Sequence, residues 1–299
     1  MKLSPLAVGV VALLPRFATA WGGFGHITVA YVASNFVANS TTAFFQGVLR
    51  NDTEDYLAGV ATWADSVRYT QWGRFSGPFH FIDAEDNPPH KCGVKLERDC
   101  SKQGCIVSAF ANYTVRILDG RLPEPEREIA AKFLIHFLGD IHQPLHTEHV
   151  ARGGNGINVT FGGVKYNLHH VWDVEIPEKI VGGVGKEHPY TEARQWADSL
   201  TEEIRSGKFK ASSQSWRKGI KFSNPELTSL GWANETNSYV CTTVLPLGPE
   251  AIVNQELGTS YYEKAAPVVE AQIAKAGYRL AAWLDLIASK INNQMAGDL

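Results

Sequence analysis

Residues 136–148 read HFLGDIHQPLHTE, so a strongly apolar segment also carries three histidines and an aspartate. If EREIAAKFLIHFLGDIH, residues 126–142, forms a helix, His136 and Asp140 stand four residues apart and share one face. A hydrogen-bonded core pair and a pair of metal ligands both have this spacing. Either way, the segment requires a fold in which a core helix carries polar side chains on one edge.

The other histidines of this segment are expected to differ in role. His142 lies about 200° around the helix from His136, so we expect it to be structural and to stay outside the site of His136. Pro144 ends or kinks the helix, which frees His146 to turn back toward that site.

A second pair with the same spacing occurs in NLHHVWD, where His169 and Asp173 stand four residues apart. His170 competes with His169, but an offset of one residue turns it about 100° away from Asp173. The repetition of an imidazole and a carboxylate at this spacing favours metal ligation over two unrelated core pairs.

Three shorter motifs add donor groups of the same kind. TWADS places Asp65 in an apolar helix, PFHF places His80 between aromatic rings, and WGGFGH runs from Trp21 to His26. A chain that begins at Trp21 also offers its α-amine and carbonyl oxygen as a chelating pair. Ligands of these types without thiolates suit zinc, and zinc sites with an open position are catalytic.

The first twenty residues have the order of a secretory signal peptide. Lys2 supplies a positive start, LSPLAVGVVALLP is an apolar run too short to span a bilayer, and Ala18-Thr19-Ala20 is a small-x-small cleavage site. Cleavage there leaves Trp21 as the first residue of one domain over 21–299. We therefore expect a secreted, extracellular, soluble protein without a membrane partner; a buried N-terminal helix is the alternative.

Charge limits the class of partner. The chain has 28 Lys and Arg and 31 Asp and Glu residues, and loss of Lys2 and Arg16 with the signal leaves 26 basic residues and a net charge of −5. The basic block that is usual in a nucleic-acid binder is missing from the sequence. If the substrate is a polyanion, something other than Lys and Arg must attract it.

Four cysteines in a secreted chain indicate disulfides, and three pairings are possible. Cys100 and Cys105 frame a short loop and are expected to pair, which leaves Cys92 for Cys241. A cysteine zinc site is the alternative, but the chain has no CxxC spacing. Sequons for N-glycosylation occur at Asn39, Asn51, Asn112, Asn158 and Asn234.

Helical periodicity dominates the remaining pattern. Helices are predicted over 25–46, 54–71, 104–119, 126–142, 190–206, 227–240 and 261–288. In GINVTFGGVKYNL, alternating apolar residues flank Gly162-Gly163, which predicts a β-hairpin with a two-residue loop. The fold class predicted is mainly α, a single helical domain with one short β-hairpin.

Several longer motifs resemble a known family. WGGFGH, ATWADS, HFIDAEDNPP, ERDCSKQGC, HFLGDIHQPLH, GGNGINVTF, NLHHVWD and AKAGYRLAAWL are similar to motifs of the secreted fungal zinc nucleases specific for single strands, the nuclease S1/P1 type. These enzymes are related to the bacterial zinc phospholipases C. The resemblance runs from Trp21 to about Ser289 and implies a mainly helical domain with three zinc ions in a cleft.

The resemblance also implies a ligand set for each zinc ion. One ion would take Asp65, His80, His136 and Asp140; a second would take His146, His169 and Asp173; the third would take the Trp21 amine and carbonyl, His26 and Asp140. Asp140 would thus bridge two ions, which share a hydroxide that attacks phosphorus in line. The remaining zinc would stabilise the leaving 3′ oxygen.

Other residues carry roles implied by the same resemblance. Arg68 corresponds to a cation aimed at the phosphoryl group, with Asn155 as its partner at the phosphate and Asp65 as a ligand at the reacting centre. Phe81 and Asp83 correspond to a base pocket that combines ring stacking with a carboxylate; stacking needs an unpaired base. The chain departs from the family pattern at Thr147, Arg152 and Val174-Glu175, which leaves base preference and pH dependence open.

The sequence therefore predicts an extracellular, monomeric trinuclear-zinc endonuclease that converts single-stranded DNA and RNA to 5′-nucleotides and has 3′-nucleotidase activity. A zinc phospholipase C is one alternative, and the Phe81–Asp83 pair argues against it because a choline headgroup has no base edge. A secreted protein with structural zinc only is the other alternative. The site of Asp173 argues against that, because three protein ligands leave room for water.

Overall fold

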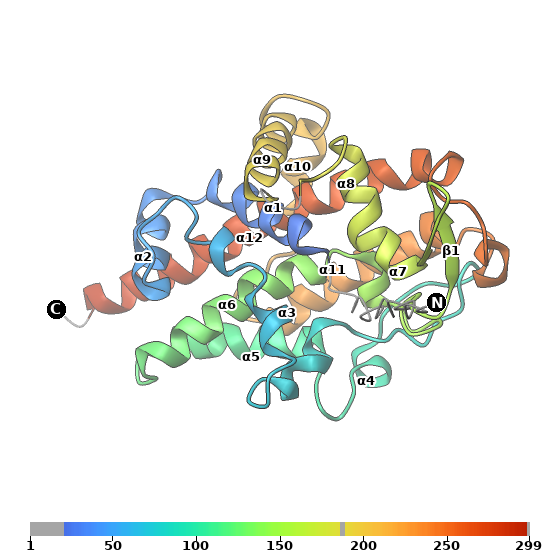
Figure 1. The fold of residues 1–299 in the computed structure, drawn as a ribbon. Coiled ribbons are helices and arrows are strands. Elements are labelled where there is room, and N and C mark those ends of the chain that lie inside the picture. Colours follow the sequence, from blue (N-terminus) through green and yellow to red (C-terminus); the bar gives the residue numbers. More distant parts are fainter. Residues whose placement is uncertain (1–20, 186–188, 298–299) are drawn as a thin grey trace, which may run out of the picture.

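The computed structural model describes residues 21–185 and 189–297, and the predicted signal peptide over 1–20 lies outside the described residues. Helices dominate the described part of the chain, and strands β1 (Asn158–Phe161) and β2 (Val164–Asn167) form one antiparallel hairpin (Figure 1). The predicted class, mainly α with one short hairpin, is confirmed.

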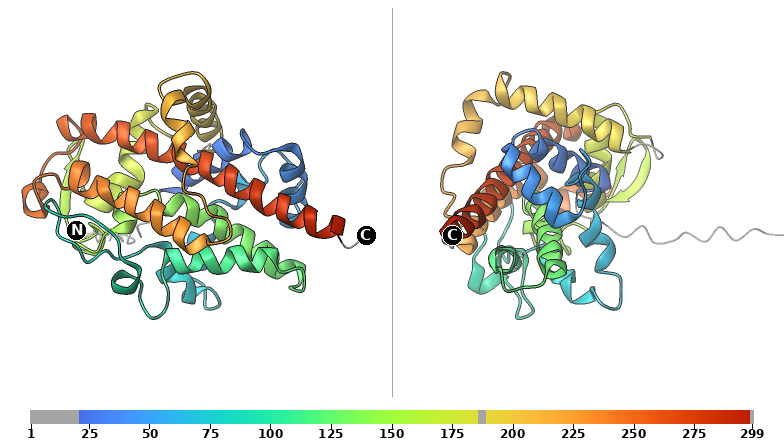
Figure 2. Two further views of the ribbon diagram at one scale, coloured as in Figure 1. Left: turned by 180° about the vertical axis from the view of Figure 1, so that it is seen from behind. Right: turned by 90° about the vertical axis from the view of Figure 1, so that its left-hand side faces the viewer.

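Three long helices form the centre of the protein. These are α1 (Gly23–Ser34), α6 (Glu124–Asp140) and α12 (Ser260–Gly297). Helix α1 packs on α12 and on α9 (Pro189–Arg205), and α6 packs on α12 and on α5 (Ile106–Leu118). Figure 2 shows α12 crossing the whole width of the molecule, so that one helix supports most of the others.

The remaining helices complete the shell around this centre. They are α2 (Asn39–Leu49), α3 (Trp63–Val67), α4 (Leu96–Asp99), α7 (Leu168–His170), α8 (Ile176–Ile180), α10 (Lys210–Trp216) and α11 (Pro225–Tyr239). Two short 3-10 segments matter for the site: η2 (Arg74–His80) and η3 (Pro144–Thr147). A π-helical turn, η4 (Val171–Glu175), follows α7.

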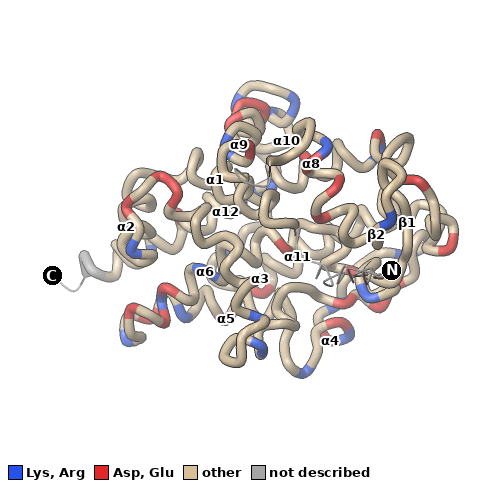
Figure 3. Tube along the Cα trace, viewed as in Figure 1, with Lys and Arg blue, Asp and Glu red and all other residues tan. Residues whose placement is uncertain are grey.

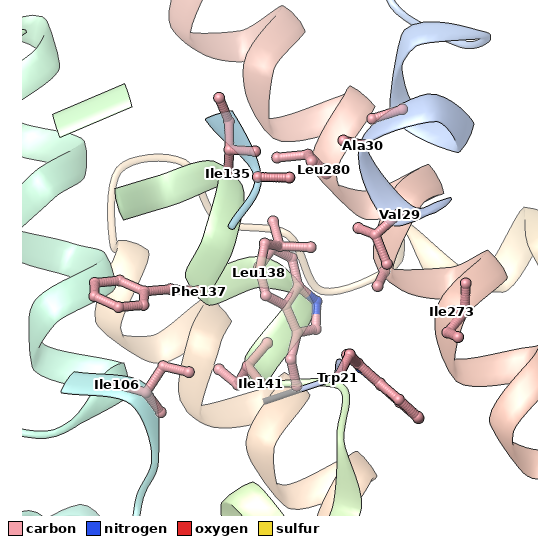
Figure 4. Packing of buried hydrophobic residues seen from close by; sticks show 14 of the residues in the cluster. Trp21, Val29, Ala30, Ile106, Ile135, Phe137, Leu138, Ile141, Ile273 and Leu280 are labelled. Carbon is pink, nitrogen blue, oxygen red and sulfur yellow. The ribbon is translucent and has the colours of Figure 1, made fainter. Parts of the chain in front are cut away.

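Apolar side chains from α1, α5, α6 and α12 meet in one continuous core (Figure 4). Trp21, Ile135, Leu138 and Leu280 are at most 1% exposed. Burial of a side chain of this size contributes about 1.5–3 kcal/mol to folding. The apolar part of α6 is thus core packing, which leaves its polar edge to be explained.

Two predicted helices are wrong in part. The helix predicted over 25–46 is interrupted between α1 and α2, where the Asn35 side-chain Nδ2 donates to Asp198 and Thr201 of α9, each at 3.0 Å. The helix predicted over 54–71 shrinks to α3 and a 3-10 turn, because the Thr70 hydroxyl donates to the Val67 carbonyl and closes a turn.

The hairpin and the disulfides agree with prediction. Gly162 and Gly163 occupy the loop with φ values of 59° and 78°, the left-handed region that a type I′ turn requires. Cys100 is bonded to Cys105, and Cys92 is bonded to Cys241. The second bond connects the chain before α4 to the turn after α11.

Figure 3 shows Lys and Arg residues interspersed with Asp and Glu residues along the chain. No helix among the described residues is both long and apolar enough to cross a lipid bilayer.

Candidate metal centre and substrate cleft

The polar edge of α6 meets two side chains from earlier in the chain. Nδ1 of His80, at the end of η2, lies 2.9 Å from Oδ2 of Asp140 and 3.1 Å from Nε2 of His136. Oδ1 of Asp65, on α3, lies 3.9 Å from Nδ1 of His80 and 3.7 Å from Nε2 of His136. All four side chains are buried, so donor atoms from three segments face one another inside the protein.

The second oxygen of Asp140 faces another helix. Its Oδ1 lies 3.1 Å from Nε2 of His26 on α1. Trp21, two residues before α1, is completely buried, and the next N–H, that of Gly22, donates to the Asp173 carbonyl at 2.8 Å. Asp140 therefore directs one oxygen toward each of two groups of donors, as a bridging carboxylate must.

A third group of donors lies beyond the end of α6. Nε2 of His146, on η3, lies 3.1 Å from Nε2 of His169, which lies 3.1 Å from Oδ2 of Asp173. The other oxygen of Asp173 accepts a hydrogen bond from the Gln143 amide at 2.5 Å. Sequence reasoning missed Gln143; its place among the histidines of residues 136–148 is the signal that could have found it.

The protonated nitrogens of three histidines are fixed by the backbone. Nδ1 of His136, His146 and His169 lies 2.6, 2.7 and 2.6 Å from the carbonyl oxygens of Ala61, His80 and Gly153, respectively. Because a carbonyl oxygen can only accept, Nδ1 carries the hydrogen. In the neutral imidazole, Nε2 then presents its lone pair to the donor group, which is how metal-binding histidines are usually oriented.

Several of these donor atoms lack a hydrogen-bond partner. Among the described residues, the buried atoms that make no hydrogen bond include His26 Nε2, Asp65 Oδ1, Asp140 Oδ1 and Asp173 Oδ2. A buried polar atom without a partner costs folding free energy, on the order of 1–3 kcal/mol. A cation bound by these nitrogen and oxygen atoms removes that cost, and the mixture of donors is the one that zinc accepts.

Three groups of donor atoms have the spacing needed to hold an ion. They are His26, Asp65 and His136; His80, His136 and Asp140; and His146, His169 and Asp173. The third group has the composition of the ligand set predicted for one zinc ion. The first two groups share His136, so the division of ligands between two ions remains a prediction.

The electrostatics of this region favour bound positive charge. Burial alone would raise the pKa of Asp140, but the neighbouring His136 and the hydrogen bonds of His136, His26 and His80 hold it well below its usual range. Burial alone would lower the pKa of His136, yet the carboxylates of Asp140 and Asp65 outweigh it and raise the pKa to about 9. Burial lowers the pKa of His80 to about 4. The Asp140 carboxylate thus stays ionised, ready for a cation.

A cleft of about 650 Å³ opens beside these donors, and His146 and His169 are part of its lining. Phe81, 37% exposed, and Asp83 also line it. Burial raises the pKa of Asp83, and Nδ1 of His149 lies 3.9 Å from its Oδ1. The cleft therefore combines an accessible aromatic face, a carboxylate and the open side of the third donor group.

Two predicted phosphate-binding residues line the same cleft. Arg68 places Nη2 3.5 Å from Oδ1 of Asp65 and donates to the hydroxyl of Tyr69 at 3.1 Å. The Asn155 amide donates to the Arg152 carbonyl at 2.9 Å. Arg68 is thus oriented by a residue of the donor groups, whereas Asn155 is oriented by the backbone of its own loop.

The structure also places the residues at which the chain departs from the family pattern. Thr147 is fully buried and donates to the Pro144 carbonyl at 2.8 Å, so it faces away from the cleft. Arg152 is exposed and lines the cleft with a left-handed φ of 60°. Glu175 pairs with His170, with Oε1 3.1 Å from Nε2.

Glu148 is a cleft residue that sequence reasoning missed. It is 1% exposed, and burial, together with the neighbouring Asp86, raises its pKa to about 8. A carboxyl group that is protonated at neutral pH can donate a hydrogen bond. Its place in HTE, two positions after His146, is the signal that could have found it.

A sequence model of the S1/P1 nuclease family matches residues 21–289, which is most of the chain. The chain belongs to the S1/P1 nuclease family. It is 49% identical to Nuclease S1 of Aspergillus oryzae, over 97% of this chain and 99% of that protein. It is 46% identical to Nuclease P1 of Penicillium citrinum and to Nuclease PA3 of a Penicillium species, each over 89% of this chain and 97% of the relative.

As a member of the S1/P1 nuclease family, the chain is an enzyme, a nuclease, and its His and Asp clusters fit a metal-dependent reaction. The sequons of this nuclease differ in their surroundings. Asn39, Asn112 and Asn158 are exposed. Asn234 accepts a hydrogen bond from the Val94 N–H at 2.8 Å and donates to the Leu230 carbonyl at 3.1 Å.

Proposed function

We propose that the chain is a secreted, zinc-dependent endonuclease that hydrolyses single-stranded DNA and RNA to 5′-nucleotides and also releases phosphate from 3′-nucleotides. The observation that supports this most directly is the convergence of three groups of buried imidazole and carboxylate donors beside a cleft that contains an arginine and an exposed aromatic ring. The names of the relatives, Nuclease S1, PA3 and P1, support nucleic acid as the substrate.

The proposed enzyme is a monomeric domain over 21–299, released from a signal peptide over 1–20. Three zinc ions are assigned to three ligand sets: Asp65, His80, His136 and Asp140; His146, His169 and Asp173; and Trp21, His26 and Asp140. Zinc in such sites acts as a Lewis acid toward phosphate and lowers the pKa of a nearby water toward about 7. The donor atoms without partners are the feature of this chain that supports the assignment.

The protein groups around the donors have separate tasks in this proposal. Asp65 lies 3.5 Å from Arg68 and holds the guanidinium beside the metal centre, where it neutralises charge on the phosphoryl group. Asn155 fixes the loop that carries the Gly153 carbonyl, which in turn orients His169. These contacts set the positions of charges before substrate enters, which is the requirement for electrostatic stabilisation of a transition state.

Recognition of the base is assigned to Phe81 and Asp83. A partly exposed ring at the cleft can stack on any base that is not stacked within a duplex, which favours single strands. The Asp83 carboxyl can then bind polar groups on the base edge. This pair also favours a nuclease over the phospholipase C alternative, because a choline headgroup offers no base edge.

The decisive experiment measures zinc per chain together with turnover. We expect about three zinc ions per chain, rapid hydrolysis of denatured DNA, slow hydrolysis of duplex DNA and phosphate release from 3′-AMP. Hydrolysis of lecithin in place of 3′-AMP would favour the phospholipase alternative. Zinc without any turnover would favour structural zinc. The Asp83→Ala variant should keep its zinc and raise KM for denatured DNA; loss of zinc would instead place Asp83 among the metal ligands.

A further inference from the structure

Large exposed aromatic side chains are concentrated in the segment 69–81. Tyr69, Trp72, Phe75 and Phe81 are 56%, 54%, 47% and 37% exposed, respectively. The other large exposed apolar side chains of the described residues are scattered along the chain. Exposed apolar groups that gather in one place usually mark a binding surface.

The segment borders two hollows. Tyr69, Phe81 and the Gly77-Pro78 part of η2 line the cleft described above. Trp72, Phe75 and Phe79 line a second hollow of about 470 Å³, and we call these three residues the aromatic strip. Because η2 contributes to both linings, the aromatic strip continues the surface of the cleft away from the metal centre.

The rings of the aromatic strip are arranged edge to face. The Trp72 and Phe75 centroids lie 5.8 Å apart at 84°, and those of Phe75 and Phe79 lie 5.9 Å apart at 72°. In an edge-to-face pair the edge of one ring meets one face of its neighbour, and the opposite face of that neighbour is left uncovered by the pair. The uncovered faces therefore remain available for planar groups from outside the protein, such as nucleic-acid bases.

The backbone beneath the aromatic strip is fixed. The Gly73 N–H donates to the Thr70 hydroxyl at 2.9 Å, and the Ser76 hydroxyl donates to the Gly73 carbonyl at 2.8 Å. A Cβ on Gly73 would lie 2.2 Å from the Val67 carbonyl oxygen, so the chain packs directly on α3 at this point. The rings are thus held in place without a ligand, which lowers the entropy cost of binding one.

Polar groups around the second hollow fit a nucleic-acid strand. Gln103 lines it with the aromatic strip, as do Arg116 and Glu126, which form an ion pair, and Arg74 is exposed on the same segment. Asn112, which carries a predicted glycosylation sequon, also lines the hollow. A glycan is therefore the competing occupant, but a glycan would not account for the continuity between the second hollow and the cleft.

We propose that the aromatic strip binds bases of a single-stranded polynucleotide beyond the nucleotide held in the cleft. This inference rests on the proposed nuclease function. Its consequence is selective: a strand long enough to reach the second hollow gains affinity, whereas a 3′-mononucleotide or a dinucleotide gains none. Since stacking accepts every base, the added affinity carries little sequence preference.

The test compares KM for a twelve-residue single-stranded oligonucleotide with KM for 3′-AMP. In the Trp72→Ala/Phe75→Ala double variant we expect KM for the oligonucleotide to rise at least about tenfold, with kcat and 3′-AMP hydrolysis unchanged. Tyr190→Ala, which removes an exposed aromatic ring on α9, is the matched control and should change neither KM. Trp72→Phe should retain most of the affinity for the oligonucleotide.

The outcomes separate this inference from the proposed function. A native enzyme that hydrolyses neither substrate overturns the nuclease proposal itself. A native enzyme that hydrolyses both, with an oligonucleotide KM that the double variant leaves unchanged, overturns the role of the aromatic strip. If substitution of Trp72 changes the oligonucleotide KM only in the Asn112→Gln variant, the glycan occupies the second hollow in the native enzyme. That outcome would also overturn the role of the aromatic strip.

Discussion

His136 and His142 lie six residues apart at the same end of α6, and both are completely buried, yet their surroundings are opposite. Nδ1 of His142 donates to the Leu138 carbonyl at 2.8 Å, and its Nε2 accepts from Arg279 at 3.0 Å. Nε2 of His136 faces only other donor groups, those of His80 and two aspartates. His136 and His142 are the same residue type and are equally buried. They differ in whether the ring nitrogens have a complete set of hydrogen-bond partners.

The charges differ in the same way. Behind α6, Glu235 binds both Arg279, at 2.5 Å, and Lys275, and burial followed by the charge of Arg279 keeps the pKa of His142 well below its usual value. This buried polar cluster satisfies itself with its own cations. On the metal side, the carboxylates of Asp140 and Asp173 have no lysine partner among the interactions found in the described residues. Polar groups without a complete set of partners therefore mark the functional side of α6.

The strongest test of this comparison changes one residue on each side of α6. Asp140→Asn removes a charge shared by two donor groups, so we expect activity on denatured DNA to fall by roughly a thousandfold or more and zinc to be lost. His142→Ala should keep its zinc and most of its activity, although it leaves Arg279 without one partner. Equal losses of activity in both variants would mean that the two faces of α6 are assigned wrongly.

Metal removal should affect stability as well as activity, because the donors come from segments spread between residues 21 and 173. Binding to the native state adds about 4 kcal/mol of stability when the free metal exceeds Kd a thousandfold. We expect EDTA to abolish turnover and to lower Tm, and zinc to restore both. An unchanged Tm after measured zinc loss would show that the donor groups do not hold the fold together.

The N-terminus gives a smaller and more selective effect. An α-amine has a lone pair for zinc, whereas a peptide nitrogen does not, so only a chain that begins at Trp21 can complete the third ligand set. Proteins with a tag before Trp21 should contain about one zinc ion fewer and hydrolyse 3′-AMP slowly, and protease trimming to Trp21 should restore both. Full zinc and full rate in a verified extended protein would remove the amine from the proposal.

The smallest effect on activity is expected behind α6. Glu235→Gln leaves two buried cations without their carboxylate, so we expect about 3 kcal/mol of destabilisation with zinc content unchanged. Burial opposes ionisation of Glu235, but Arg279 and Lys275 lower its pKa to about 2. Its contribution is therefore present above about pH 4.3, the unfolded pKa, and is lost as the pH falls toward 2. The Tm difference between wild type and variant should shrink over that range; a constant difference would contradict the ion-pair explanation.

Local patterns predicted the parts of the fold that depend on local structure. The apolar period of α6 and the Gly162-Gly163 turn are examples, since each follows from neighbouring residues. The break after α1 could not be predicted, because the Asn35 side chain binds Asp198, which is 163 residues away. Such a contact exists only once the fold has formed.

The candidate site, like the fold, was predictable only where it depends on local spacing. The four-residue spacing indicates that His136 and Asp140 face one way, and likewise His169 and Asp173. It does not reveal which groups meet, and that assignment came from the family resemblance. Gln143 and Glu148 carry no spacing pattern at all. Their roles depend on hydrogen bonds and burial that only the folded chain creates.

The position of α12 has a consequence for the order in which the enzyme is made. Every proposed zinc ligand lies between Trp21 and Asp173, so the ribosome has synthesised all of them more than eighty residues before it reaches α12 at Ser260. Yet α12 packs on both α1 and α6, which carry His26, His136 and Asp140. A nascent chain therefore holds a full set of ligands without the support that aligns them. If the proposed ligand sets are right, we expect zinc loading of the sites on α1 and α6 to follow chain completion, so that metal content reports finished folding.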